Sequence, residues 1–188
     1  AAMVESGIRA VLGQGVIDFP APGVPDPGKN IQAAKAFVSQ IRDLSRRITP
    51  SIFCHSPYTC SAATLVAAKQ AAEDAGILFQ IHAAETRNEL HMIDGCNEHS
   101  VIAYLDDLGL LNERTLLVHS VWINDGDIEI LYKRSARVAH CPESNMKLAS
   151  GIAPVPRMMD ANIVVGIGTD GCASNNDQDL FSDMDMAA

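Results

Sequence analysis

The chain has 188 residues, which suits one domain or a large piece of one, and its 47% hydrophobic content is ample for a buried core. The net charge of −9 argues against nucleic-acid and anionic-membrane partners, because both require basic patches. No apolar stretch approaches the ~18–20 residues of a membrane-spanning helix, and the start of the sequence shows no charged segment followed by an apolar one, so we expect no membrane partner.

Strand and helix signals alternate from the start of the chain. An apolar run at residues 8–13 predicts the first strand, and four prolines within residues 20–27 predict a loop. Apolar residues at helical spacing predict a helix over residues 31–48. Pro50 is expected to block its continuation, because proline cannot donate the next hydrogen bond of a helix.

The same alternation continues to the end of the chain. Further strands are predicted at residues 52–54, 77–81, 116–118, 138–142 and 163–168. Further helices are predicted at residues 61–75, 100–108, 125–133, 154–160 and 179–188. About six strands, each followed by a helix, predict an α/β fold with a parallel sheet and helical crossovers. We find no domain boundary and expect residues 1–188 to form a single domain.

The five cysteines are scattered and form no Cys-x-x-Cys pair. They are Cys54, Cys60, Cys96, Cys141 and Cys172. An odd, scattered count in a chain of this size predicts reduced thiols of a cytoplasmic protein and no disulfide framework.

Three of the apolar runs end in a residue type that binds metals. They lead into His82, His119 and Asp170. An α/β barrel keeps its chemistry at the carboxyl ends of its strands, so two imidazoles and a carboxylate there can converge on one ion. Zinc and iron are the ions that such ligands suit. Glu85, three residues after His82, could move protons to and from a bound water.

Each of these residues also fits a plain structural role. His82 and Glu85 could belong to a surface turn, His119 could be a hydrogen-bonded structural residue, and Asp170 could be a turn aspartate. Three such strand endings in one chain favour the shared site. For His55, substrate contact and a turn set by Pro57 remain equally open.

A Cys/His nucleophile is a further alternative, suggested by the neighbours His140 and Cys141. A buried strand residue followed by a turn explains this pair better.

Several motifs resemble those of the amidohydrolase superfamily. They are His-Ala-Ala-Glu-Thr from His82, Leu-Val-His-Ser around His119, Ala-His-Cys-Pro-Glu-Ser-Asn-Met-Lys-Leu from Ala139, Gly-Thr-Asp-Gly-Cys-Ala-Ser-Asn-Asn from Gly168, and residues 55–61. Their order and spacing most resemble the branch of 5-methylthioadenosine/S-adenosylhomocysteine deaminases and triazine chlorohydrolases. The resemblance implies a (β/α)8 TIM-type barrel and a metal-dependent aminohydrolase acting on a small amino-substituted heterocycle.

The resemblance also implies a role for each candidate residue. His82 and Asp170 would bind a divalent metal, zinc first and iron as the alternative, and Asp170 would also take a proton from the attacking water. Glu85 would contact the substrate and shuttle protons to its ring nitrogen and leaving group. His119 would orient the attacking hydroxide or the substrate, and His55 would help to hold the substrate.

The chain departs from the family pattern at its start. No histidine precedes His55, so the first-strand His-x-His of the family is absent. The strand near Ile8 would then match the third barrel strand, with the first two βα units and the β-sandwich missing. A full barrel takes ~250 residues, so we expect an internal piece of a longer enzyme.

Two rival functions therefore stay open. One is a triazine-type chlorohydrolase with the same metal site. The other is an inactive, self-associating fragment, because an open barrel exposes sheet edges and apolar faces. On either view we expect a homo-oligomer.

Overall fold

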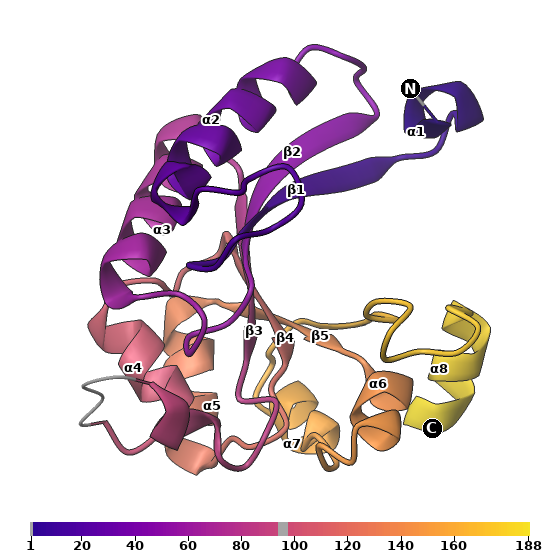
Figure 1. Ribbon diagram of the computed structural model, residues 1–188. Coiled ribbons are helices and arrows are strands. Elements are labelled where there is room, and N and C mark those ends of the chain that lie inside the picture. Colours follow the sequence, from indigo (N-terminus) through magenta and orange to yellow (C-terminus); the bar gives the residue numbers. More distant parts are fainter. Residues whose placement is uncertain (1, 94–97) are drawn as a thin grey trace. The chain divides into compact units, whose positions relative to one another are not determined.

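The computed structural model describes residues 2–93 and 98–188, and within them six strands are ordered β1-β2-β3-β4-β5-β6 (Figure 1). The strands are β1 Ala10–Val16, β2 Ile48–Cys54, β3 Leu78–Ala83, β4 Thr115–His119, β5 Arg137–His140 and β6 Val165–Ile167. The pairs β1–β2, β2–β3, β4–β5 and β5–β6 are parallel, and helical segments connect successive strands. This confirms the predicted α/β fold of about six parallel strands with crossover helices. The strands do not close into a barrel, because β1 and β6 end the order.

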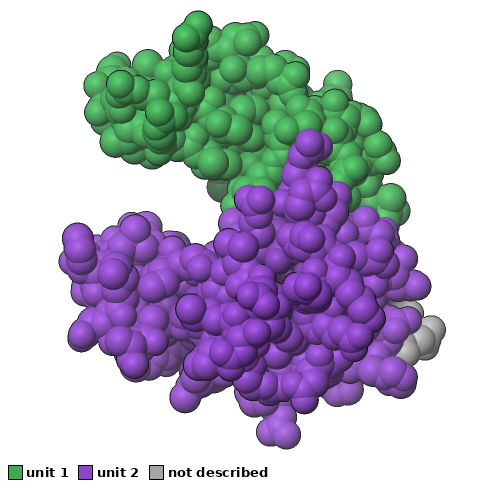
Figure 2. Space-filling model, turned by 180° about the vertical axis from the view of Figure 1, so that it is seen from behind, with its two compact units in different colours: residues 1–81 green, residues 82–188 purple. Residues whose placement is uncertain are grey.

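The helices follow the strands much as predicted, with some different ends. They are α1 Ala2–Ser6, α2 Asn30–Ile41, α3 Ala62–Ala75, α4 Val101–Asp107, α5 Asp125–Arg134, α6 Pro142–Lys147, α7 Val155–Asp160 and α8 Leu180–Ala187. Two short 3₁₀ turns, η1 Pro27–Lys29 and η2 Glu89–Met92, complete the elements. The chain divides into two compact units, residues 1–81 and 82–188 (Figure 2). A single domain stays a prediction.

In the first unit, α2 and α3 cover one face of β1 and β2 (Figure 1). The two strands run in register from Ala10 opposite Ile48 to Val16 opposite Cys54. Ser61 caps α3 by accepting a hydrogen bond from the Thr64 backbone N–H at 3.2 Å, and Gly76 ends the helix in a left-handed conformation. Apolar side chains from the strands and from α3 fill the core between these layers, among them the fully buried Ile52, Leu65 and Phe79.

The predicted helix over residues 31–48 is too long. Helix α2 ends at Ile41, Leu44 is 52% exposed, and Ile48 already begins β2. Pro50 therefore lies inside a strand, opposite Leu12 of β1. The strand tolerates this proline because its pairing with β3 begins only at Ser51, so Pro50 has a strand neighbour on one side alone.

In the second unit, β4, β5 and β6 pair in parallel, and α4 lies beside α5 (Figure 1). A capping box starts α5: the Asp127 backbone N–H donates to the Asn124 side chain at 3.1 Å, and the Asn124 N–H donates to the Asp127 carboxylate at 2.9 Å. Strand β6 is only three residues long, shorter than the predicted 163–168. The short α6, just after β5, was not predicted.

Four cysteines lie in the described residues, and all four are free thiols, with Cys54, Cys60 and Cys141 buried and Cys172 exposed. The reduced state of the thiols stays a prediction, and Cys96 lies outside the described residues. Within residues 2–93 and 98–188, no helix is both long enough and apolar enough to cross a membrane.

Candidate metal centre

Three strand ends bring His82, His119 and Asp170 together. His82 is the last residue but one of β3, His119 ends β4, and Asp170 follows β6 by three residues. One potential ligand atom from each residue lies within 4.8 Å of the others. The predicted convergence of these three side chains is therefore confirmed.

The spacing of the donor atoms suits a metal ion better than direct hydrogen bonds. His82 Nε2 lies 3.6 Å from Asp170 Oδ1, and His119 Nε2 lies 3.9 Å from Asp170 Oδ2. Both distances exceed hydrogen-bond length. Two ligand atoms of a tetrahedral zinc ion are about 3.4 Å apart, as bond lengths near 2.1 Å require. Two imidazoles and one carboxylate thus fit a divalent ion with small side-chain adjustments.

His119 is held in the form that binds metals. Its side chain is buried, and burial lowers the pKa of the imidazole although the carboxylates of Glu85 and Asp170 oppose that shift. Its Nδ1 lies 2.9 Å from Oδ1 of Asn145, so Nδ1–H donates and Nε2 keeps its lone pair. That lone pair faces the Asp170 carboxylate.

Asp170 is held as a carboxylate. Its Oδ2 accepts hydrogen bonds from the hydroxyls of Ser144 at 2.7 Å and Ser174 at 2.6 Å. Burial alone would raise the pKa of the Asp170 carboxyl, but the contact with His82 and the two serine hydrogen bonds outweigh it. The pKa is therefore held well below its usual range, which keeps the ligand charged.

Glu85 stands beside this set of donors. Its Oε2 lies 3.8 Å from His119 Nε2, which is the same nitrogen that faces Asp170. A carboxylate in this place can exchange protons with a group bound between the three donors.

His55 lies in the first unit, one residue after β2. Its Nδ1 is 2.9 Å from the Thr59 hydroxyl and 3.3 Å from the Ser56 hydroxyl, within a turn. Its contact with substrate stays a prediction.

The His140 and Cys141 pair does not form an activated nucleophile. Burial is the largest factor that raises the pKa of the Cys141 thiol to about 12, so the thiol stays protonated. The structural interpretation of this pair is the better one.

The backbone at the candidate centre is left-handed at several residues that are not glycine. The φ angles are 52° at Ala84, 78° at His119, 49° at Ser120 and 59° at Asp170. Such conformations cost of order 1–3 kcal/mol each and gather at functional sites.

Four residues of this centre were missed by sequence reasoning: Ser144, Asn145, Ser174 and Glu89. The first three lie in motifs that carried the resemblance, yet hydroxyl and amide side chains are common in loops. Only the fold shows that they hydrogen-bond to His119 and Asp170. For Glu89, the one feature of the sequence that could have indicated its role is a second glutamate four residues after Glu85.

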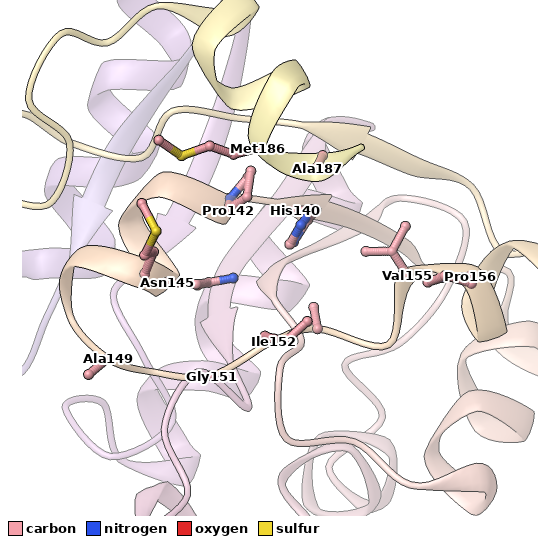
Figure 3. Close-up of a pocket in the computed structure, with 12 residues that line it drawn as sticks. His140, Pro142, Asn145, Ala149, Gly151, Ile152, Val155, Pro156, Met186 and Ala187 are labelled. Atoms are coloured by element: carbon pink, nitrogen blue, oxygen red, sulfur yellow. The ribbon is translucent and has the colours of Figure 1, made fainter.

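Asn145, which contacts His119, also lines a cavity of about 560 Å³. Figure 3 shows the side chains of Asn145 and His140 pointing into this space, which Ile152, Val155 and Met186 also line. Asn145 Nδ2 and His140 Nδ1 have no hydrogen-bond partner among the residues that the structure describes.

Comparison with known proteins gives a consistent picture. The sequence matches the Amidohydrolase family over residues 1–188. The 5-methylthioadenosine/S-adenosylhomocysteine deaminase of Aquifex aeolicus is 41% identical over 184 residues, which are 98% of this chain and 43% of the relative. The 5′-deoxyadenosine deaminase of Methanopyrus kandleri is 41% identical over 188 residues, with 100% of this chain and 43% of the relative covered.

A solved structure supports the same assignment. The crystal structure of an adenosine deaminase from Xanthomonas campestris with bound zinc superposes with a TM-score of 0.92 and 34% identity. The match covers 98% of this chain and 42% of that chain. The chain thus spans less than half the length of the relatives that it matches.

Proposed function

Since this chain belongs to the amidohydrolase family, we propose that it carries the metal centre of an aminohydrolase that deaminates a small heterocycle. The observation that carries the proposal is the convergence of His82, His119 and Asp170, with the Glu85 carboxylate 3.8 Å from His119 Nε2. These are the donors and the proton carrier that such a reaction requires.

His82 and Asp170 would hold the metal ion, with His119 close enough to complete a set of three protein ligands. A bound divalent ion supplies a Lewis acid that lowers the pKa of water toward ~7. Zinc is our first choice, supported by the zinc in the adenosine deaminase from Xanthomonas campestris. Iron remains the alternative, because it accepts the same donors.

The surrounding side chains would manage the protons. Asp170, held as a carboxylate, would accept a proton from the attacking water. Glu85 would deliver protons to the ring nitrogen and then to the departing amine. The C–O bond would form first at the ring carbon, as the ring nitrogen takes up a proton, and the C–N bond to the protonated amine would then break, which gives ammonia and a ring carbonyl. His119 would orient the attacking oxygen or the substrate, and His55 would help to hold the substrate.

The substrate class is proposed to be an amino-substituted heterocycle. The names of the two 41% identical relatives support a narrower proposal, an adenosine-type nucleoside. The proton shuttle agrees with this choice, because the amine of such a nucleoside leaves only once it is protonated.

Displacement of chloride from a triazine is the rival reaction at the same metal site. The position of Glu85 favours deamination, since chloride needs no proton to leave and ammonia does. Parallel measurement of chloride and ammonia release separates the two reactions.

The second rival is not an enzyme: the chain would be an inactive fragment that self-associates. Strands β1 and β6 end the strand order, and Val11 on β1 and Val164 beside β6 are 53% and 64% exposed. Apolar edges of this kind favour association, so we also propose a homo-oligomer. A cytoplasmic location is proposed from the odd, scattered cysteines, a pattern typical of reduced thiols.

The test uses the full-length protein that carries these residues. We expect zinc-loaded protein to release ammonia from an aminopurine nucleoside, and chelated protein to regain activity when zinc is added back. Failure of the metal-loaded protein to release ammonia from aminopurine, aminopyrimidine, pterin and triazine substrates would contradict the proposal.

A further inference from the structure

Glu89 is a buried acid at the edge of the candidate centre. It begins the short turn η2, and only 1% of its surface is exposed. Among residues 2–93 and 98–188, no lysine, arginine or histidine forms an ion pair with it. Burial is the main factor that raises the pKa of its carboxyl to about 7. Burial of an acid without a basic partner costs folding free energy, so its hydrogen bonds should offset that cost or serve the site.

Both oxygens of Glu89 bind the backbone beside Glu85. Oε1 accepts a hydrogen bond from the Ala84 N–H at 3.1 Å, and Oε2 accepts one from the Glu85 N–H at 2.7 Å. Successive N–H groups that converge on one anion need an unusual backbone, and Ala84 provides it with its φ of 52°. Glu89 therefore satisfies two buried N–H groups that no regular element would pair.

The carbonyl groups of the same turn are fixed from the other side. Ser120 N–H donates to the Ala83 carbonyl at 3.1 Å. The N–H groups of Val121 and Trp122 donate to the Ala84 carbonyl at 2.9 and 2.8 Å. These donors directly follow His119, so the turn between His82 and Glu85 is held between Glu89 and the end of β4.

We propose that Glu89 is a positioning residue, which holds the turn after His82 so that the Glu85 side chain faces the metal centre. It acts through the backbone N–H groups of Ala84 and Glu85 and does not itself touch the reacting atoms. This inference rests on the proposed function in so far as Glu85 carries protons. The geometry of the turn is independent of that role.

The first test asks whether Glu89 acts through Glu85. In the full-length, zinc-loaded protein, we expect Glu89→Gln to lower kcat by roughly 10–100-fold, because the amide NH₂ opposes one backbone N–H and the turn shifts. KM and zinc content should change by less than about threefold. In a Glu85→Gln background, Glu89→Gln should cost no further activity, since the group that it positions is already lost. Additive losses would overturn the proposal.

Two control variants separate positioning from general stability. Asp127 is also a buried acid that binds backbone, in the capping box of α5, and Asp127→Asn should lower the melting temperature and leave kcat unchanged. Glu113 is exposed, so Glu113→Gln should change neither quantity. Glu89→Asp keeps the charge and should retain more activity than Glu89→Gln, which gives a second variant if the latter does not fold. A Glu89→Asp variant no more active than Glu89→Gln would count against the proposal.

The second test needs no activity. Hydrogen–deuterium exchange should quicken at least about tenfold at the amides of residues 84 and 85 in Glu89→Gln, and stay unchanged in α5. Unchanged protection at both amides would overturn the proposal even if ammonia release is found. Faster exchange with no ammonia release from any variant would instead contradict the proposed function. It would still support the role of Glu89 in holding the turn.

Discussion

The amide oxygen of Asn145 and Nδ1 of His119 lie 2.9 Å apart, and this contact decides which imidazole nitrogen of His119 is free. Asn145 comes from α6, after β5, while His119 ends β4. Two adjacent strand ends thus cooperate: one supplies the donor atom and the other orients it. An outer partner of this kind is common around metal-binding histidines.

Replacing Asn145 should therefore weaken metal binding without removing a ligand. In the full-length protein, we expect Asn145→Leu to lower zinc affinity by about 10–100-fold, because His119 loses the acceptor that fixes its tautomer. Competition with a chromogenic chelator measures the affinity. Asn145→Asp keeps an acceptor and should lose less; equal affinity in all three proteins would refute the orienting role.

Glu85→Gln should separate metal binding from turnover. The variant keeps all three candidate ligands and loses the proton carrier, so zinc content should stay the same while turnover falls by roughly 10²–10⁴-fold or more. Elemental analysis and ammonia release on the full-length protein give the two values. Full activity in this variant would rule out the shuttle, and loss of zinc would instead assign Glu85 to metal binding.

Burial of Glu89 should make stability depend on pH. Its carboxyl has a pKa of about 7 in the fold against 4.5 as the reference value, so the native state keeps a proton that the unfolded chain releases. The free energy of unfolding should then fall as pH rises from 4.5 to 7, by roughly 3 kcal/mol in total. Glu89→Gln should remove this decrease. Urea unfolding at several pH values checks it, and identical pH profiles for the variant and the parent would show the expectation to be wrong.

The 188 residues by themselves should associate. Because β1 and β6 each lack one strand neighbour among the described residues, we expect dimers or larger species. The described residues bring three candidate donors together, and the first-strand His-x-His is absent from the sequence, so we also expect weak or absent zinc binding and no deaminase activity. Light scattering after size exclusion, with elemental analysis, tests this. A monomer that holds one zinc tightly and releases ammonia would show that the retained site is more complete than expected.

The spacing of apolar residues along the sequence sufficed to predict single helices and the ends of strands. The Ala-rich run, Ser61 and Gly76 sufficed to predict α3, and the apolar runs before His82, His119 and Asp170 sufficed to predict strand ends that meet. The start of β2 was missed because Leu44 and Ile48 continue the helical spacing of apolar residues beyond Ile41, where α2 ends. Asn145 was missed because tertiary structure alone brings it to His119. Glu89 was missed because its partners are the backbone N–H groups of Ala84 and Glu85, and no side-chain pattern marks backbone partners.

The left-handed backbone at Ala84, His119 and Asp170 has a consequence for how this sequence can change. Glycine adopts such φ angles without strain. Selection for thermal stability alone would therefore tend to replace these three residues by glycine first. At His119 and Asp170 that route removes a candidate ligand outright. At Ala84 it keeps every ligand but loosens the segment that directs Glu85. Substitutions that raise the thermal stability of this protein without loss of activity should therefore lie elsewhere, in the helices, and not in these turns.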